Sequence, residues 1–217
     1  MSINIAIFAS GTGSNAEEII KYFSSSSNLH PAQTEDRQNE NLSLNEETPG
    51  KKRIRVSLIV CNKPGAGVLN IAKKYNIPTI LLEKEKFSNG YGYADELKEQ
   101  HINLIVLAGF LWKVPPALVN AYPGKILNIH PALLPKYGGK GMYGAAVHTA
   151  VIASGDQVSG ITIHIVDELY DHGHHIFQAF CPVLPGDTPD TLAARIHALE
   201  HSNYPKVIEE FAKKIMD

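Results

Sequence analysis

An amide and an imidazole stand two residues apart in the segment Asn128-Ile129-His130-Pro131. Residues two apart in a strand point to the same face, so we expect Asn128 and His130 to share one. An amide N–H beside an imidazole suits a carbonyl oxygen that gains negative charge during a reaction. The alternative is that both side chains have no catalytic role and only form hydrogen bonds with backbone groups of a nearby loop.

A second polar group, residues 167–175, contains three acids and three histidines. Metal binding is disfavoured because the adjacent His174 and His175 would face opposite sides of a strand, and the segment lacks paired ligands at zinc-site spacing. We therefore expect no metal. One carboxylate of the segment is expected instead to reach His130 and raise its pKa, so that an imidazolium stabilises negative charge.

A glycine turn, Gly11-Thr12-Gly13-Ser14-Asn15, lies between an apolar run and an amphipathic helical segment. Free N–H groups at the start of a helix bind anions, so this turn predicts a phosphate site. A dinucleotide site would also have an acid at the end of the second strand, and none stands there. The alternative is a turn that needs its glycines only for close packing.

The whole chain suits one domain, residues 1–217, with 44% hydrophobic and 19% charged residues. A net charge of −2 offers no basic field for nucleic acid or a membrane surface. No apolar run reaches the roughly 18 residues of a membrane helix, and the first residues do not resemble a signal peptide. Cys61 and Cys181 are expected in the core of a cytoplasmic protein, although a single bridge between them stays open.

Strand and helix patterns alternate along most of the chain, which predicts an α/β fold: a Rossmann-like, doubly wound, mostly parallel sheet. Strands are expected at 3–9, 56–61, 78–82, 104–108 and 126–129. Two later strands, 160–166 and 176–183, are expected to form an antiparallel C-terminal pair before a long final helix. Residues 24–53 contain only four apolar side chains, so we expect a flexible polar insertion there, with a functional lid as the alternative.

These motifs together resemble the glycinamide ribonucleotide formyltransferases, a folate-dependent family of purine synthesis. The matching blocks are residues 9–15, 108–110, 127–131 with 133–137, and 160–164 with 171–173. The resemblance covers nearly the whole chain except 24–53, and it implies the formyltransferase fold. It also implies two small-molecule substrates, 10-formyltetrahydrofolate and glycinamide ribonucleotide, with no metal, in a monomer or a homodimer.

The family's residue roles are carried over by position. The catalytic trio falls on Asn128, which would bind the formyl oxygen, His130, which would stabilise the oxyanion, and Asp171, which would keep His130 protonated. The ribonucleotide would contact Gly13, Ser14, Asn15, His197 and Glu200. Folate would contact Leu111, Trp112, Val114, Asn128, Asp167, Glu168 and Asp171.

Three departures and three rival functions accompany this resemblance. The turn 169–173 contains a histidine where other members often have Gly or Glu. Some members carry a folate-contacting arginine near the position of Asn70, where this chain has none, and the loop 137–144 is rich in glycine. A methionyl-tRNA formyltransferase would need an extra C-terminal domain and a basic surface. A formyltetrahydrofolate hydrolase keeps a similar trio but usually follows a regulatory domain. A non-catalytic nucleotide- or folate-binding module stays as the alternative outside enzymes.

Overall fold

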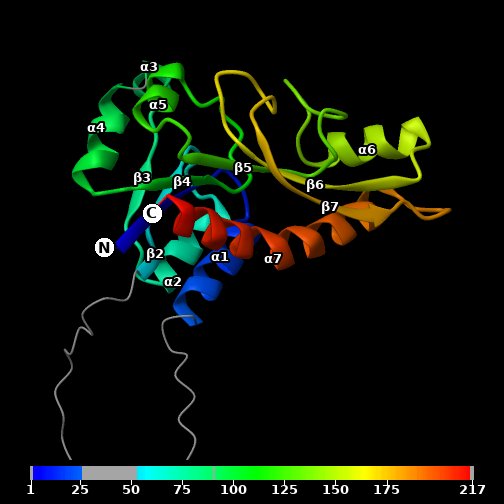
Figure 1. Ribbon diagram of the computed structural model, residues 1–217, viewed down its shortest axis with the longest axis horizontal. Helices are drawn as coiled ribbons and strands as arrows, with labels where there is room; N and C mark the ends of the chain where they lie inside the picture. Colours follow the sequence, from blue (N-terminus) through cyan, green and yellow to red (C-terminus); the bar gives the residue numbers. More distant parts are fainter. Residues whose placement is uncertain (1, 26–52, 90, 216–217) are drawn as a thin grey trace, which may run out of the picture.

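The computed structural model describes residues 2–25, 53–89 and 91–215 (Figure 1). Most of the segment 24–53 therefore lies outside the described residues; Ser24 and Ser25 end a helix, and Arg53 begins a strand. The elements are β1 (Ser2–Ala9), α1 (Ser14–Ser25), β2 (Arg53–Cys61), α2 (Gly67–Lys74), β3 (Thr79–Leu81), α3 (Lys84–Asn89), α4 (Tyr91–Glu99), β4 (Leu104–Leu107), α5 (Pro116–Ala121), β5 (Ile126–His130), α6 (Ala145–Ser154), β6 (Val158–Ile165), β7 (His175–Pro182) and α7 (Pro189–Lys214).

The described strands form one sheet in the order β3-β2-β1-β4-β5-β6-β7. The first five pair in parallel, whereas β6 runs antiparallel to both β5 and β7. The prediction of a doubly wound, mostly parallel sheet with an antiparallel C-terminal pair is confirmed. Strand order reverses between β1 and β4, and open α/β sheets bind ligands at the carboxyl ends of strands beside such a point.

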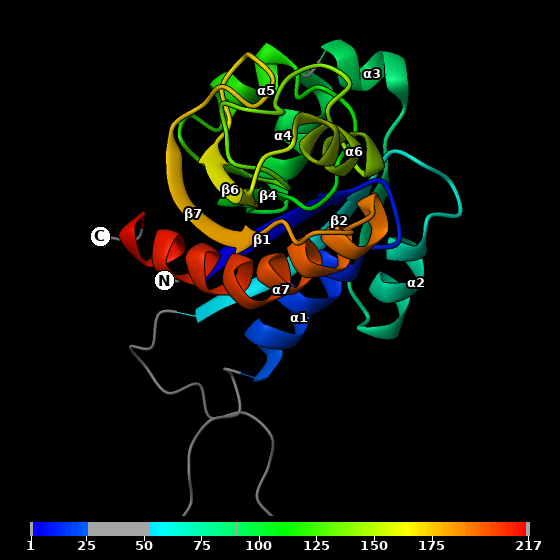
Figure 2. The ribbon, with the colours of Figure 1, turned by 90° about the vertical axis from the view of Figure 1, so that its right-hand side faces the viewer.

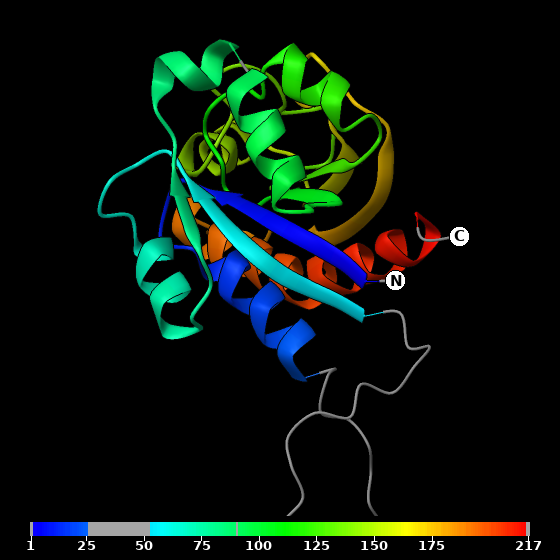
Figure 3. The same ribbon diagram turned by 90° about the vertical axis from the view of Figure 1, so that its left-hand side faces the viewer.

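Helices cover both faces of the sheet, as the apolar run of β1 requires (Figure 3). Alternate residues of β1 enter two different cores because successive side chains of a strand point to opposite faces. Ile5 and Ile7 pack in the core that includes α1 and α7. Ala6 and Phe8 pack in the core that includes α4 and α5.

The long helix α7 lies across the sheet beside α1 (Figure 2). A capping box between Thr188 and Thr191 sets its start. Further along, the fully buried Tyr204 donates its hydroxyl to the carbonyl of Leu107 at 2.9 Å. Glu200 lies one turn earlier on the same side of the helix, so this bond holds Glu200 near the strand ends.

Two helices were absent from the sequence-based prediction. α3 and α5 have six residues each, and each buries one side chain, Phe87 and Leu118 respectively. A helix that buries one residue shows no apolar periodicity, so the sequence carries no signal for it. Cys61 and Cys181 are buried free thiols. Among the helices described, none is both long and apolar enough to cross a membrane.

Candidate active site

The carboxyl ends of β1 and β4 are joined through Ser10. Its backbone N–H donates to the carbonyl of Gly109 at 3.1 Å, and its hydroxyl accepts from the N–H of Leu111 at 2.9 Å. The glycine turn after β1 is thereby fixed beside the segment that follows β4. His130, the last residue of β5, lies one strand further along the same edge.

The three residues of the expected trio come together at this edge. The Asn128 side-chain N–H2 lies 3.5 Å from Asp171 Oδ1, and His130 Nδ1 lies 3.5 Å from Asp171 Oδ2. Asn128 and His130 do share a face of β5, as the two-residue spacing predicted. Asp171 arrives from the loop after β6, so its approach to β5 depends on the antiparallel pairing of those strands.

His164 also belongs to this cluster and was missed as a site residue. It pairs directly with Asn128 across β5 and β6, and the Asn128 N–H2 donates to its Nε2 at 3.0 Å. The other ring nitrogen of His164, Nδ1, lies 3.3 Å from the carbonyl oxygen of Ile165. The sequence offered one signal for it: Thr162 and His164 are polar residues two apart in an otherwise apolar strand, so they share one face.

Asp171 is held by its own loop in an uncommon conformation. Its φ of 51° is left-handed, and the backbone N–H of Gly139 donates to its Oδ2 at 2.9 Å. Close packing also fixes the turn, because a Cβ on Gly173 would lie 1.7 Å from the carbonyl of Ile165. Burial raises the pKa of Asp171, but His164, the charge of His130 and the Gly139 N–H outweigh it, so this pKa lies below its usual value.

His130 departs from the expected protonation. Its side chain is buried, and its Nε2–H donates to the carbonyl of Tyr137 at 2.7 Å. Burial lowers the pKa of His130 below its usual value, and the opposing effects of Asp171 and the Tyr137 carbonyl do not make up the difference. The expectation of a raised pKa was wrong. It considered the nearby carboxylate, which raises the pKa, but the sequence does not show how far burial removes water from the ring, which lowers it.

The predicted phosphate turn and the two C-terminal residues meet on the α1 side of the sheet. The Asn15 side chain donates to Glu200 Oε2 at 2.9 Å, and His197 Nδ1 lies 3.0 Å from the same oxygen. The hydrogen bond to Glu200 raises the pKa of His197. Gly13 precedes Ser14, the first residue of α1, with a φ of 85°, so N–H groups at the start of α1 adjoin this cluster.

A further histidine, His148, lies buried on the face of α6 that includes Val147 and Val151. Its Nδ1 has no hydrogen-bond partner within the part of the chain that the structure describes. Burial and the charge of His197 lower the pKa of His148. His148 is therefore a buried histidine whose Nδ1 is unsatisfied within the described residues.

A cavity opens on the other side of the trio. Its lining residues are Leu107, Phe110, Trp112, Lys113, Val114, Asn128, His164, Val166, Asp167, Leu169, Tyr170 and Asp171. Trp112, Val114 and Asp167, which the family resemblance assigned to folate, line this cavity together with Asn128 and Asp171. Leu111 and Glu168 do not line it, and the Leu111 side chain is 50% exposed.

The histidine-rich segment 167–175 forms an ion pair at the protein surface. His172 Nδ1 lies 2.7 Å from Asp167 Oδ2, and both side chains are exposed to solvent. In the residues with assigned positions, no three His, Cys, Asp or Glu side chains form a group that could hold a metal ion.

A family model and curated relatives of known name both match this chain to formyltransferases. A family model described as "Formyl transferase" matches residues 3–208. Phosphoribosylglycinamide formyltransferase of Bacillus subtilis is 35% identical over 209 residues, which are 94% of this chain and 92% of that protein. The chloroplastic enzyme of the same name from Vigna unguiculata is 42% identical over 163 residues, 73% of this chain. The chain spans 52% of that plant protein.

Solved structures give the same match. The structure of phosphoribosylglycinamide formyltransferase from Bacillus halodurans superposes with a TM-score of 0.73 at 35% identity, over 93% of this chain and 91% of that one. Glycinamide ribonucleotide transformylase 1 from Symbiobacterium toebii superposes with a TM-score of 0.79 at 27% identity, over 98% and 89%.

Proposed function

The chain belongs to the formyl transferase family, and from this premise we propose that it transfers the formyl group of 10-formyltetrahydrofolate to the amine of glycinamide ribonucleotide. The products are formylglycinamide ribonucleotide and tetrahydrofolate, in de novo purine synthesis. Relatives that bear the name phosphoribosylglycinamide formyltransferase support this substrate pair. The proposal includes a cytoplasmic location and a site that needs no metal.

One observation carries the proposal: the trio lies between two different sites. On one side, the glycine turn and Asn15 meet Glu200, an arrangement that suits a phosphate and hydroxyl groups. On the other side, a cavity with Trp112 in its wall also has Asn128 and Asp171 in its wall. A reaction that joins a ribonucleotide to a group carried on a flat, heteroaromatic donor needs this layout.

The cavity suits the donor by its chemistry. The Trp112 ring supplies apolar surface for a pterin, and Asp167 offers a carboxylate that accepts hydrogen bonds from its N–H groups. Trp112 is itself packed against Phe87 and Phe110, with ring centroids 5.8 and 6.5 Å apart, so this wall is preorganised. We assign Trp112, Val114 and Asp167 to the donor, and Leu111 and Glu168 only to the rim.

Asn128 is the residue that we assign to the formyl oxygen. One N–H of its amide is engaged by His164 at 3.0 Å, whereas the contact with Asp171 is at the limit of hydrogen bonding, 3.5 Å. The second N–H can therefore turn to an oxygen of the substrate at little cost. When the amine nitrogen attacks the formyl carbon, this N–H stabilises the charge that gathers on the oxygen.

His130 is the residue that we assign to the proton of the attacking amine. With its Nε2–H bound to Tyr137 and its pKa lowered by burial, the neutral ring offers the Nδ1 lone pair on the Asp171 side. Taking the proton converts it into the imidazolium that the sequence had suggested, now beside Asp171 and the oxyanion. The proton then goes to the departing nitrogen of the folate as the C–N bond breaks.

The test is a comparison of formyl transfer with formyl hydrolysis. Purified protein with 10-formyltetrahydrofolate is followed spectroscopically, with and without glycinamide ribonucleotide. We expect turnover only with the ribonucleotide, and its loss in His130→Ala and Asp171→Asn proteins that keep the wild-type circular dichroism spectrum. Equal rates without the acceptor would establish the hydrolase, and no turnover in either mixture would favour the non-catalytic binding module.

A further inference from the structure

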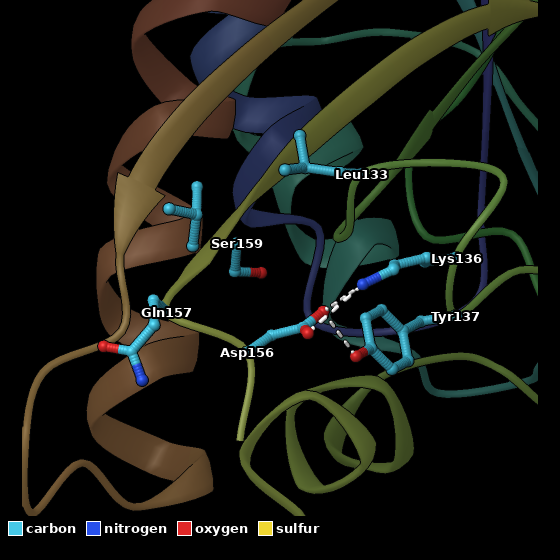
Figure 4. A pocket seen from close by; sticks show the side chains of 7 residues that line it. Leu133, Lys136, Tyr137, Asp156, Gln157 and Ser159 are labelled. Carbon is cyan, nitrogen blue, oxygen red and sulfur yellow. Dashed lines mark hydrogen bonds and ion pairs between the residues drawn. The ribbon is translucent and has the colours of Figure 1, made fainter. Parts of the chain in front are cut away.

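A second hollow, of about 370 Å³, shares no lining residue with the cavity that contains Trp112 (Figure 4). Its lining residues are Leu133, Lys136, Tyr137, Asp156, Gln157, Val158 and Ser159. Asn128, His130 and Asp171 are not in its wall. Figure 4 shows the Tyr137 ring reaching along this hollow toward Asp156, so one residue of the wall extends from the active-site loop to the turn after α6.

The Tyr137 hydroxyl is anchored at that turn. It donates to Asp156 Oδ2 at 2.7 Å and lies 2.6 Å from the hydroxyl of Ser154, the last residue of α6. Lys136 binds the same carboxylate at 2.9 Å, but its side chain is 65% exposed, so that ion pair contributes little to holding the loop against α6. The hydroxyl is therefore the stronger tie between the loop and α6.

The backbone of the same segment touches both members of the proton-transferring pair. The carbonyl of Tyr137 accepts from His130 Nε2 at 2.7 Å, and the N–H of Gly139 donates to Asp171 Oδ2 at 2.9 Å. Between them, Gly138 packs so closely that a Cβ would lie 3.2 Å from the Cβ of Asp171. A shift of this segment would move the partner of His130 and the partner of Asp171 together.

The conformation of Tyr137 needs support from outside the loop. Its φ of 57° is left-handed, which is uncommon and strained for a residue other than glycine. The hydrogen bonds of the Tyr137 hydroxyl to Asp156 and Ser154 hold the side chain in place, and they thereby keep the backbone of Tyr137 from relaxing to a negative φ.

We propose that Tyr137 is a positioning residue, whose hydroxyl, anchored on Asp156 and Ser154, fixes the backbone of residues 137–139 and with it the placement of His130 against Asp171. The kinetic part of this inference rests on the proposed function, and the spectroscopic part does not. Small misplacements of a reacting pair cost rate far more than they cost affinity.

The experiment compares Tyr137→Phe, Asp156→Ala and the double variant with the wild type. We expect each single variant to lower kcat about tenfold with the KM for the ribonucleotide within about twofold. Because both substitutions break one anchor, the double variant should lose no more than the worse single one. Tyr75→Phe is the matched control: it removes a similar hydroxyl bond, to Glu17 at 3.2 Å, away from the trio.

The second readout is the NMR titration of the His130 ring in the free protein, which requires no activity. Tyr137→Phe keeps the backbone carbonyl of residue 137 but frees it to move away from His130 Nε2, and because this hydrogen bond raises the pKa of His130, the midpoint should move to lower pH, with no shift in Tyr75→Phe. A merely structural role would lower the melting temperature and leave the midpoint and kcat unchanged, which would overturn the proposal. Additive losses in the double variant would also overturn it.

The two proposals fail in different ways. If the wild type transfers no formyl group, the proposed function is wrong, and the His130 titration still decides the role of Tyr137. If Tyr137→Phe does not fold, Asp156→Ala, which keeps the tyrosine, decides both readouts in its place.

Discussion

Asn15 Nδ2 donates to Glu200 Oε2 at 2.9 Å across 185 positions of the chain. The bond links the glycine turn at the end of β1 to the middle of α7, where Glu200 is buried. His197 approaches the same oxygen at 3.0 Å, so one carboxylate organises two of the side chains expected to bind the ribonucleotide. We therefore expect substitution of Glu200 to weaken ribonucleotide binding, because it disturbs both Asn15 and His197.

Glu200→Gln should raise the KM for glycinamide ribonucleotide by tenfold or more and change kcat by less than threefold. The neutral amide still approaches Asn15, but it no longer attracts the charge of His197 or binds a hydroxyl as strongly. Initial rates at varied ribonucleotide and saturating donor measure both constants. Glu210→Gln, the same change on the exposed side of α7, is the control, and a similar KM effect there would contradict the assignment.

Activity should fall on acidification with a midpoint below pH 6.5, the usual pKa of histidine. A residue that accepts a proton must be neutral, and burial lowers the pKa of His130, so protonation and loss of rate occur at lower pH than for an exposed imidazole. Asp171 opposes this effect by raising the pKa. In Asp171→Asn the midpoint should therefore move lower still, along with a fall in kcat.

The pH profile of kcat from 4.5 to 8 measures this midpoint, with Asp190→Asn on the exposed start of α7 as the control for a lost carboxylate. A midpoint above 6.5 would show that Asp171 outweighs burial and that His130 is protonated before the reaction begins.

Binding of the donor should quench the intrinsic tryptophan fluorescence, because Trp112 is the only tryptophan of the chain and lines the cavity that we assign to the donor. Titration with tetrahydrofolate, corrected for its absorbance, measures this binding without turnover. Glycinamide ribonucleotide alone should change the emission much less. Equal quenching by both substrates, or none by the folate, would argue against the assignment of this cavity to the donor.

Gly13→Ala should destabilise the protein by about 1–3 kcal/mol and weaken ribonucleotide binding. A Cβ at this position would lie 2.8–2.9 Å from the side chain of Ile71 and from Val68, on a backbone with a φ of 85°. Urea unfolding measures the first effect, and KM measures the second. Gly11→Ala is the control, since a Cβ there has no heavy atom within 4 Å; equal losses in both would show that close packing is not the reason for the glycine.

Local patterns were sufficient for much of the fold and for part of the site. Continuous apolar runs identified the buried strands, and the two-residue spacing placed Asn128 and His130 on one face, because both features depend only on neighbours in the chain. The pairing of His164 with Asn128 was not accessible in this way. It depends on the register between β5 and β6, which the sequence of either strand leaves open.

By itself, the sequence determined the α/β fold, the glycine turn before α1 and the chemical types gathered at the strand ends, since these follow from composition and short-range spacing. Only the tertiary structure decided three features of the site: the lowered pKa of His130, the hydrogen bonds of residues 137–139 to His130 and Asp171, and the presence of Trp112 rather than Leu111 in the wall of the cavity that we assign to the donor. Burial, water exclusion and the approach of distant segments are properties of the packed molecule, and no local pattern encodes their balance.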